Sequence, residues 1–182
     1  MSDRIALSYS GLRTFQNCPR AYMHRYLDRI EPIGERARSL RVGSAFHKGL
    51  EAYYTGRSVM VAVNAEFAAT AGNADDQVNL AKVRAMVDAY IRRYPLDAEP
   101  FTVERVEFEF AGEIVNPETG AQSRTFDIGG KVDGVIVLDG ELWILEHKTT
   151  SGEIDIAYIE KLWTDFQIHL YAHYLEKLMG AP

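Results

Sequence analysis

The stretch Lys131-Val-Asp-Gly-Val-Ile-Val-Leu-Asp-Gly-Glu-Leu-Trp-Ile-Leu-Glu-His-Lys-Thr-Thr150 decides the fold, because two apolar runs in it flank the dipeptide Asp139-Gly140. An Asp-Gly between such runs is a strong signal for a β-hairpin, since a type I′ turn needs positive φ at both central residues. With this dipeptide in the turn, Leu138 pairs with Glu141. We therefore predict antiparallel strands over about residues 123–138 and 141–148.

Two acids and a lysine gather at the open end of this hairpin. The register set by the turn brings Asp133 opposite Glu146, and Lys148 lies two residues further along on the same side of its strand. Like charges directly opposite each other destabilise a sheet. A divalent cation between the carboxylates removes the repulsion, and Mg²⁺ binds one or two carboxylates together with waters and phosphate oxygens. The alternative interpretation is an acidic pair at a strand end beside a solvated lysine.

The rest of the chain sets the hairpin in a mixed fold. Residues 102–110 alternate apolar and charged side chains, which predicts a half-exposed strand. Strand 141–148 is apolar on both faces, so we expect it inside the sheet with cover on each side. Gly129-Gly130 predicts a bend or bulge, and residues 33–41 a connecting loop. Helix signals predict helices over about residues 8–17, 19–27, 43–54, 58–71, 76–94 and 154–178.

This order of elements predicts an α/β fold with a mixed central β-sheet flanked by helices. The length suits a single domain over residues 1–182, with a mainly helical lobe over 1–98 and the sheet and closing helix over 99–182. No apolar run approaches the roughly 20 residues of a membrane span, and the N-terminus begins no signal peptide. The single cysteine, Cys18, excludes an internal disulfide, so we expect a cytoplasmic protein.

The charge of the chain is unevenly distributed. The net charge of −6 by itself argues against a nucleic-acid partner. Residues 1–48, however, hold nine Lys or Arg and four Asp or Glu, whereas residues 49–182 hold eleven and twenty-two. A basic N-terminal region can present a local phosphate-binding surface on an acidic protein, and a solvated helix face is the alternative.

Two helical segments carry further candidate residues. His47 follows Gly43 by about one helical turn, and neutral imidazole is a good ligand for manganese and a tolerable one for magnesium. Gln167 and Tyr171 stand at i, i+4 on one face of the closing helix, where they suit a phosphate and a base. Read alone, each of these is equally an ordinary residue of a core or an amphipathic helix.

The second predicted helix interleaves cations with aromatic rings. Arg20, Tyr22, Arg25 and Tyr26 form a pattern that suits single-stranded nucleic acid. The alternative is a pair of packed helices whose arginines face solvent. The i, i+4 pair His169 and His173 on the closing helix lacks the glutamate of the zinc-protease pattern, so we interpret it as a surface pair.

Five segments in order along the chain resemble the PD-(D/E)XK nuclease superfamily, and within it the RecB-like and phage exonuclease branch. Its members show a helical start running from Ser through Cys-Pro to an aromatic residue, then Gly-x-x-x-His, Gly-x-x-Asp, acidic-x-Lys-Thr and Gln-x-x-x-Tyr segments. The corresponding segments here are Ser10–Tyr22, Gly43–His47, Gly130–Asp133, Glu146–Thr149 and Gln167–Tyr171. Five motifs in order are far more specific than any one of them.

The resemblance implies hydrolysis of DNA phosphodiester bonds with Mg²⁺ or Mn²⁺. By it, His47, Asp133 and Glu146 hold the metal, the backbone carbonyl of His147 adds a ligand, and Lys148 serves the attacking water. We therefore expect a metal-dependent DNA exonuclease that acts near single-stranded ends in recombination or repair, in the cytoplasm of a bacterium or of a phage-infected host.

The same resemblance assigns the DNA contacts. It implies that Gln167 and Tyr171 support the metal site and contact DNA, and that Arg20, Tyr22 and Arg25 engage the strand. Superfamily members continue past the Gln-x-x-x-Tyr helix with a further strand, so we also expect this chain to lack its C-terminal strand.

Two alternative functions stay open. A non-catalytic DNA-binding or assembly module on the same fold keeps the basic helices without cutting, although the intact acidic pair speaks against it. A nuclease of the CRISPR-adaptation type holds an iron–sulfur cluster on one early and three late cysteines. Cys18 occupies the early position, but no other cysteine follows in these 182 residues, so this alternative requires a longer parent protein that carries the cluster.

Overall fold

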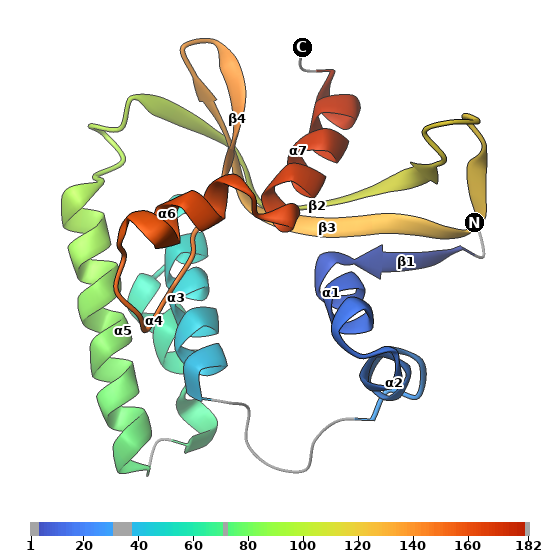
Figure 1. Cartoon of the computed structure of the whole chain (residues 1–182). Helices are drawn as coiled ribbons and strands as arrows, with labels where there is room; N and C mark the ends of the chain where they lie inside the picture. The colour runs from blue at the N-terminus through green and yellow to red at the C-terminus, as the bar shows by residue number, and fades with distance from the viewer. Residues whose placement is uncertain (1–3, 31–37, 71–72, 181–182) are drawn as a thin grey trace. The chain divides into compact units, whose positions relative to one another are not determined.

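The computed structural model describes residues 4–30, 38–70 and 73–180. The chain forms two compact units: the first comprises Met1–Gly34, Glu109–Lys131 and Ile154–Pro182, and the second comprises Glu35–Phe108 and Val132–Glu153. A short strand, a run of helices, three consecutive strands and two further helices follow one another along the chain, and the mixed sheet with its helices makes the fold α/β, as the sequence predicts (Figure 1). The assignment of residues 1–182 to one domain, divided near residue 98, stays a prediction.

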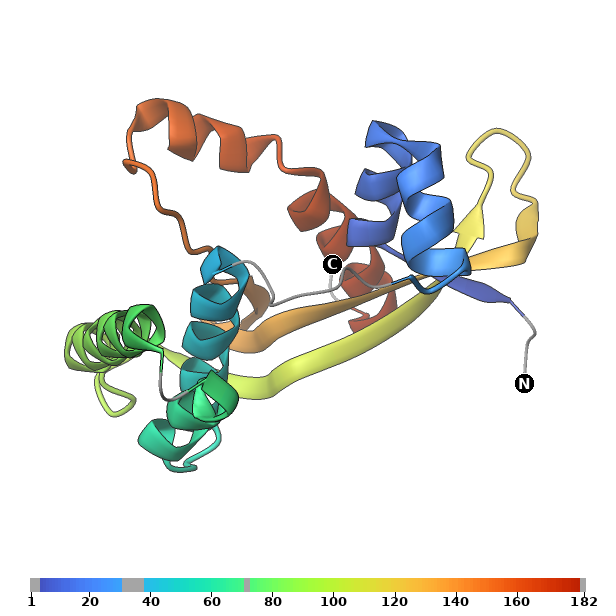
Figure 2. The same ribbon diagram turned by 90° about the horizontal axis from the view of Figure 1, so that it is seen from below.

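Three helices form the hydrophobic core of the second unit. They are α3 (Arg38–Tyr54), α4 (Val59–Ala65) and α5 (Ala74–Arg93), and the short 3₁₀ helix η2 (Ala68–Thr70) follows α4 in sequence. The three helices lie side by side (Figures 1 and 2) and bury one apolar cluster that consists of Ala45, Phe46, Leu50, Val63, Phe67, Val83 and Val87. Close packing in this cluster holds α3 in place within the second unit.

The first unit begins with a short strand and a helical pair. Strand β1 (Ile5–Ser8) leads into α1 (Tyr9–Asn17), and the Ser8 hydroxyl caps that helix. Helix α2 (Pro19–Tyr22) starts at its proline, as predicted, and continues as the π-helical turn η1 (Met23–Leu27). The two blue helices lie side by side in Figure 2.

The first unit ends with two helices, α6 (Ile156–Trp163) and α7 (Phe166–Met179). The predicted single closing helix over residues 154–178 is therefore wrong. Asp165 explains the break, because its carboxylate accepts the amides of Gln167 and Ile168 and caps a new helix.

The sheet has four strands, and β3 is the neighbour of the other three. Besides β1 they are β2 (Phe101–Val115), β3 (Gln122–Leu138) and β4 (Glu141–Leu145). Strand β1 pairs in parallel with residues 126–129 of β3, whereas β4 pairs antiparallel with residues 134–138. The sheet is therefore mixed, as predicted. The four residues of β1 were too few to give a sequence pattern.

Two local predictions need correction. Among the described strands β4 pairs with β3 alone, and Trp143 is 55 % exposed, so this strand is not enclosed in the sheet as expected. Residues 38–41 belong to α3 and not to a loop, while the preceding residues of that predicted loop lie outside the described ones. Gly129-Gly130 lies inside strand β3, without positive φ, and the bend or bulge expected there stays a prediction.

Within the described parts of the chain, no helix combines the length and the apolar character that a membrane span requires.

Candidate active site

The β3–β4 hairpin has the turn and the register that its sequence predicts. Asp139 and Gly140 adopt φ values of 54° and 85°, as a type I′ turn requires. Pairing begins at Leu138 with Glu141 and continues in that register as far as Leu145, where β4 ends. The strand is thus three residues shorter than the predicted 141–148.

The backbone pairing of β3 with β4 ends next to Asp133, whose side chain accepts a hydrogen bond from a backbone amide. The amide of His147 donates to Oδ2 of Asp133 at 2.7 Å. This contact replaces the predicted direct cross-strand pairing of Asp133 with Glu146. The segment after Leu145 is consequently held by side-chain contacts and not by the sheet.

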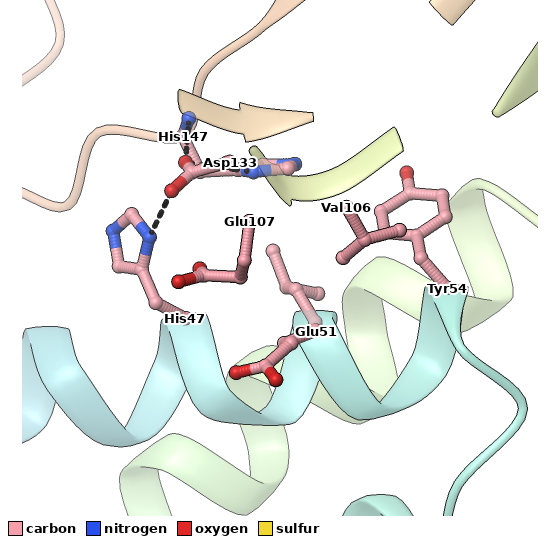
Figure 3. Close-up of a pocket in the computed structure, with 8 residues that line it drawn as sticks. His47, Glu51, Tyr54, Val106, Glu107, Asp133 and His147 are labelled. Carbon is pink, nitrogen blue, oxygen red and sulfur yellow. Dashed lines mark hydrogen bonds and ion pairs between the residues drawn. The ribbon is translucent and has the colours of Figure 1, made fainter. Parts of the chain in front are cut away.

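Two histidines from different elements hold the Asp133 carboxylate (Figure 3). Nδ1 of His47, on α3, lies 2.9 Å from Oδ1, and Nδ1 of His147, just after β4, lies 3.2 Å from Oδ2. An ionised carboxylate only accepts hydrogen bonds, so both ring nitrogens donate. The Asp133 side chain is only 18 % exposed, and charge-assisted bonds of this kind are stronger than neutral ones.

Burial and hydrogen bonding act in opposite directions on these groups. Burial favours a raised pKa for Asp133, but the hydrogen bonds from His147 and His47 hold this pKa well below its ordinary value. The hydrogen bond to Asp133 raises the pKa of His47 against the effect of burial, and the charges of Asp133, Glu146 and Glu107 add to it. The negative charges of three carboxylates therefore converge on one imidazole.

Gly43 lets α3 approach the segment that follows β4. A Cβ atom at this position would lie 3.3 Å from Oγ1 of Thr149. His47 stands one helical turn later, on the same face of the helix. The close packing expected for this glycine is thus observed, and it helps to bring His47 to Asp133.

Lys148 contacts the second acid of the predicted set. Its Nζ donates to Oε1 of Glu146 at 2.9 Å, and both side chains are partly buried. The charge of Glu146 also acts on His47. The structure thus brings the four predicted residues together in one unit as two hydrogen-bonded pairs, His47 with Asp133 and Lys148 with Glu146.

Several residues of this site escaped the sequence analysis. His47, Asp133 and His147 line a pocket together with Leu50, Glu51, Tyr54, Val106 and Glu107 (Figure 3). Glu107 adopts a φ of 50°, which is uncommon for a residue other than glycine, and its carboxylate points toward His47 in the figure. Nothing in an alternating strand pattern distinguishes such a glutamate from a solvent-facing one. The helical spacing of Glu51 and Tyr54 from His47 was the only available signal for those two.

The predicted DNA-contacting residues of the N-terminal helices lie in the first unit. Arg20 and Arg25 are exposed. The ring of Tyr22 stacks on Tyr26 at 5.1 Å, and the Arg25 guanidinium lies 5.7 Å from the centre of the Tyr26 ring. The Arg25 cation and these two rings therefore share one surface, whose contact with DNA stays a prediction.

Gln167 and Tyr171 also belong to the first unit. Gln167 is partly buried in the first turn of α7, and Tyr171 is buried, with 8 % of its surface exposed. The Tyr171 ring packs edge-to-face against Phe110 at 5.1 Å. Their contribution to the metal site and to DNA contact stays a prediction. His169 and His173, on the same helix, are exposed, as expected for a surface pair.

The donor chemistry of the site fits a hard divalent cation. In residues 4–30, 38–70 and 73–180, no three His, Cys, Asp or Glu side chains are arranged as a ready metal cage. The negative charges that act on His47 nevertheless come from the carboxylates of Asp133, Glu146 and Glu107, and carboxylate oxygens are ligands that Mg²⁺ and Mn²⁺ prefer. Since Nδ1 of His47 donates to Asp133, its Nε2 is the nitrogen suited to a metal, the usual arrangement of a metal-binding histidine.

A comparison with models of protein families matches residues 6–182 to the PD-(D/E)XK nuclease superfamily. The chain belongs to this superfamily. A search of curated proteins found no match to this chain. Nucleases of this superfamily act on nucleic acids and generally use divalent cations such as Mg²⁺ or Mn²⁺. The Asp133, Glu146 and Lys148 of this chain stand in the order that gives the superfamily its name.

Proposed function

We propose that this superfamily member is a metal-dependent DNA exonuclease of the RecB-like or phage exonuclease branch, which acts near single-stranded ends in recombination or repair. One observation carries the proposal. Asp133 is bonded to His47 and His147 in the same unit in which Lys148 is bonded to Glu146, and the charges of both acids reach His47. A cytoplasmic location follows from this role.

Each residue has a definite part in this proposal. A bound Mg²⁺ or Mn²⁺ supplies an activated water and neutralises charge on the scissile phosphate. The metal ion would be held by Nε2 of His47, the carboxylates of Asp133 and Glu146, and the carbonyl of His147. Lys148, kept in place by Glu146, orients the attacking water and stabilises the charge that develops on the phosphate oxygens.

The DNA strand is engaged by the helices of the first unit. The exposed Arg20 and Arg25 neutralise phosphates, while the Tyr22 and Tyr26 rings offer stacking surfaces to unpaired bases. Gln167 and Tyr171 support the site in this proposal.

The test uses the full chain with two substrates of one sequence, a linear fluorescent single-stranded oligonucleotide and the same strand closed into a circle. We expect Mn²⁺-dependent shortening of the linear strand, an intact circle, and no reaction in EDTA. Cleavage of the circle would contradict an exonuclease, and cleavage in EDTA would contradict the metal. Binding of both substrates without any cleavage would instead support a non-catalytic DNA-binding module.

A further inference from the structure

A chain of hydrogen bonds leads from Asp133 into the helical core of the second unit. His147 contacts Asp133 through Nδ1, and its other ring nitrogen, Nε2, lies 2.9 Å from the hydroxyl of Tyr90 on α5. The Tyr90 hydroxyl in turn lies 2.7 Å from the hydroxyl of Tyr54 on α3. Four side chains from three different parts of the sequence are therefore joined end to end.

The chemistry of these groups fixes the direction of the chain for a neutral imidazole. Asp133 only accepts, so the proton of His147 sits on Nδ1 and Nε2 is an acceptor. Tyr90 then donates to Nε2, and its oxygen accepts the hydroxyl proton of Tyr54. Burial raises the pKa of both tyrosines, which keeps their hydroxyl protons in place for these bonds.

Packing holds the rings of this chain in one orientation. The His147 side chain is 11 % exposed, and its ring meets the Tyr90 ring edge-on at 5.3 Å. Tyr90 also packs edge-on against Phe46, a member of the apolar cluster shared by α3, α4 and α5. The orientation of the imidazole is therefore set by the helical core on one side and by Asp133 on the other.

This anchoring falls where the sheet no longer supports the chain. The paired ladder ends at Leu145, and His147 stands between Glu146 and Lys148. Its side chain ties this segment to α5 and, through Tyr90, to α3, and the same side chain also contacts Asp133.

We propose that the His147 side chain, anchored by Tyr90 and Tyr54, is a positioning residue that fixes the Asp133 carboxylate for a divalent cation. This role differs from that of the His147 backbone carbonyl, and it rests on the proposed metal-dependent function. Residues that orient a metal ligand through a hydrogen bond typically contribute about 10- to 100-fold to metal affinity or activity.

The test compares four variants of the full chain with the wild type. His147→Ala removes the side-chain hydrogen bonds to both Asp133 and Tyr90. His147→Asn keeps a donor near the position of Nδ1 but loses the hydrogen bond to Tyr90. Tyr90→Phe removes only the hydroxyl. Tyr53→Phe is the matched control. The Tyr53 hydroxyl, next to Tyr54 on α3, also makes two hydrogen bonds, to the Tyr94 carbonyl and from the Leu96 amide, but it is not part of the hydrogen-bond chain that leads to Asp133.

Mn²⁺ affinity by calorimetry, turnover of a linear oligonucleotide and thermal unfolding in EDTA are measured for each. We expect Mn²⁺ binding to be about tenfold weaker in His147→Ala and about threefold weaker in His147→Asn and Tyr90→Phe. These three variants should also turn over more slowly at saturating DNA. Tyr53→Phe should bind Mn²⁺ with wild-type affinity.

Two failures of this test can be told apart. A wild type that binds Mn²⁺ and cuts DNA, with His147→Ala and Tyr90→Phe within twofold of it, overturns the positioning role alone. An equal loss in Tyr53→Phe and Tyr90→Phe does the same, because it would reflect general weakening of the fold. A wild type that neither binds Mn²⁺ nor cuts overturns the proposed function and the positioning role together.

Discussion

Gly130 and Asp133 belong to one short motif of the sequence, yet they end in two different environments. Gly130 lies in the first unit beneath aromatic rings, since a Cβ atom there would stand 2.5 Å from Phe110 and 2.7 Å from Tyr171. Asp133 lies in the second unit and is held by hydrogen bonds from two histidines. This motif therefore groups a glycine that serves packing with an acid of the proposed active site, and mutations should separate the two.

The largest expected effect tests the chemical side of this comparison. Lys148→Ala removes the ammonium group beside Glu146, and we expect hydrolysis to fall by about 100-fold or more, with DNA binding nearly intact. Single-turnover cleavage and fluorescence anisotropy with the same oligonucleotide measure the two quantities. The exposed lysine of α5 in the same unit, replaced in Lys82→Ala, is the control and should cut normally. Turnover of Lys148→Ala above a tenth of wild type would contradict its role.

The next effect tests the packing side. Gly130→Ala places a methyl group against the Phe110 and Tyr171 rings, and we expect a loss of about 1–3 kcal/mol in the free energy of unfolding from overpacking. Urea denaturation measures it. In the control Gly152→Ala, the new Cβ would meet only Thr150 at 3.5 Å, an ordinary contact. If Gly130→Ala were as stable as wild type but lost Mn²⁺ affinity, this glycine would serve the metal site, and the comparison would fail.

The same contrast explains what the sequence could and could not predict. The hairpin register follows from Asp139-Gly140, because a two-residue turn fixes every later pair in the ladder. The end of the ladder depends on a contact between Asp133 and His147 that no local pattern encodes.

Long-range contacts also account for the other differences. Tyr90 reaches His147 from another helix, and Gly130 faces rings that lie far away in sequence. Glycine in a strand signals a bulge or a close approach equally well, and only the tertiary structure decides between them. His47, Asp133, Glu146 and Lys148 could be predicted from their motifs, whereas the tyrosines and glutamates around them could not.

A smaller effect concerns the aromatic and cationic surface of the first unit. Arg25→Ala removes one exposed charge beside Tyr26, and we expect about fivefold weaker binding of single-stranded DNA, roughly 1 kcal/mol, with turnover at saturating DNA unchanged. The slope of log affinity against log salt should fall by about one. Arg92→Ala removes an exposed arginine from α5 and is the control for charge alone. Equal losses in both variants would show that net charge, and not this surface, attracts DNA.

The smallest expected effect is a pH dependence of stability that arises from His47. Its contact with Asp133 raises the pKa of His47, so the stabilisation is complete below the ordinary histidine value of 6.5 and is lost as the pH rises through the raised pKa. The lowered pKa of Asp133 keeps the carboxylate ionised at pH 5.5. The destabilisation caused by His47→Gln, measured in EDTA, should therefore be larger at pH 5.5 than at pH 8.5, by less than about 1 kcal/mol in this partly solvated site.

His24 provides the matched comparison in the first unit. It also contacts an acid, Asp28, at 3.1 Å, but the two side chains are 43 % and 44 % exposed. Solvent screens such a pair, so His24→Gln should change stability little. A pH dependence as large in His24→Gln as in His47→Gln would mean that any histidine–carboxylate contact in this chain behaves alike. The enclosure of Asp133 between two histidines would then give His47 no special electrostatic character, and its suitability as a metal ligand would depend on geometry alone.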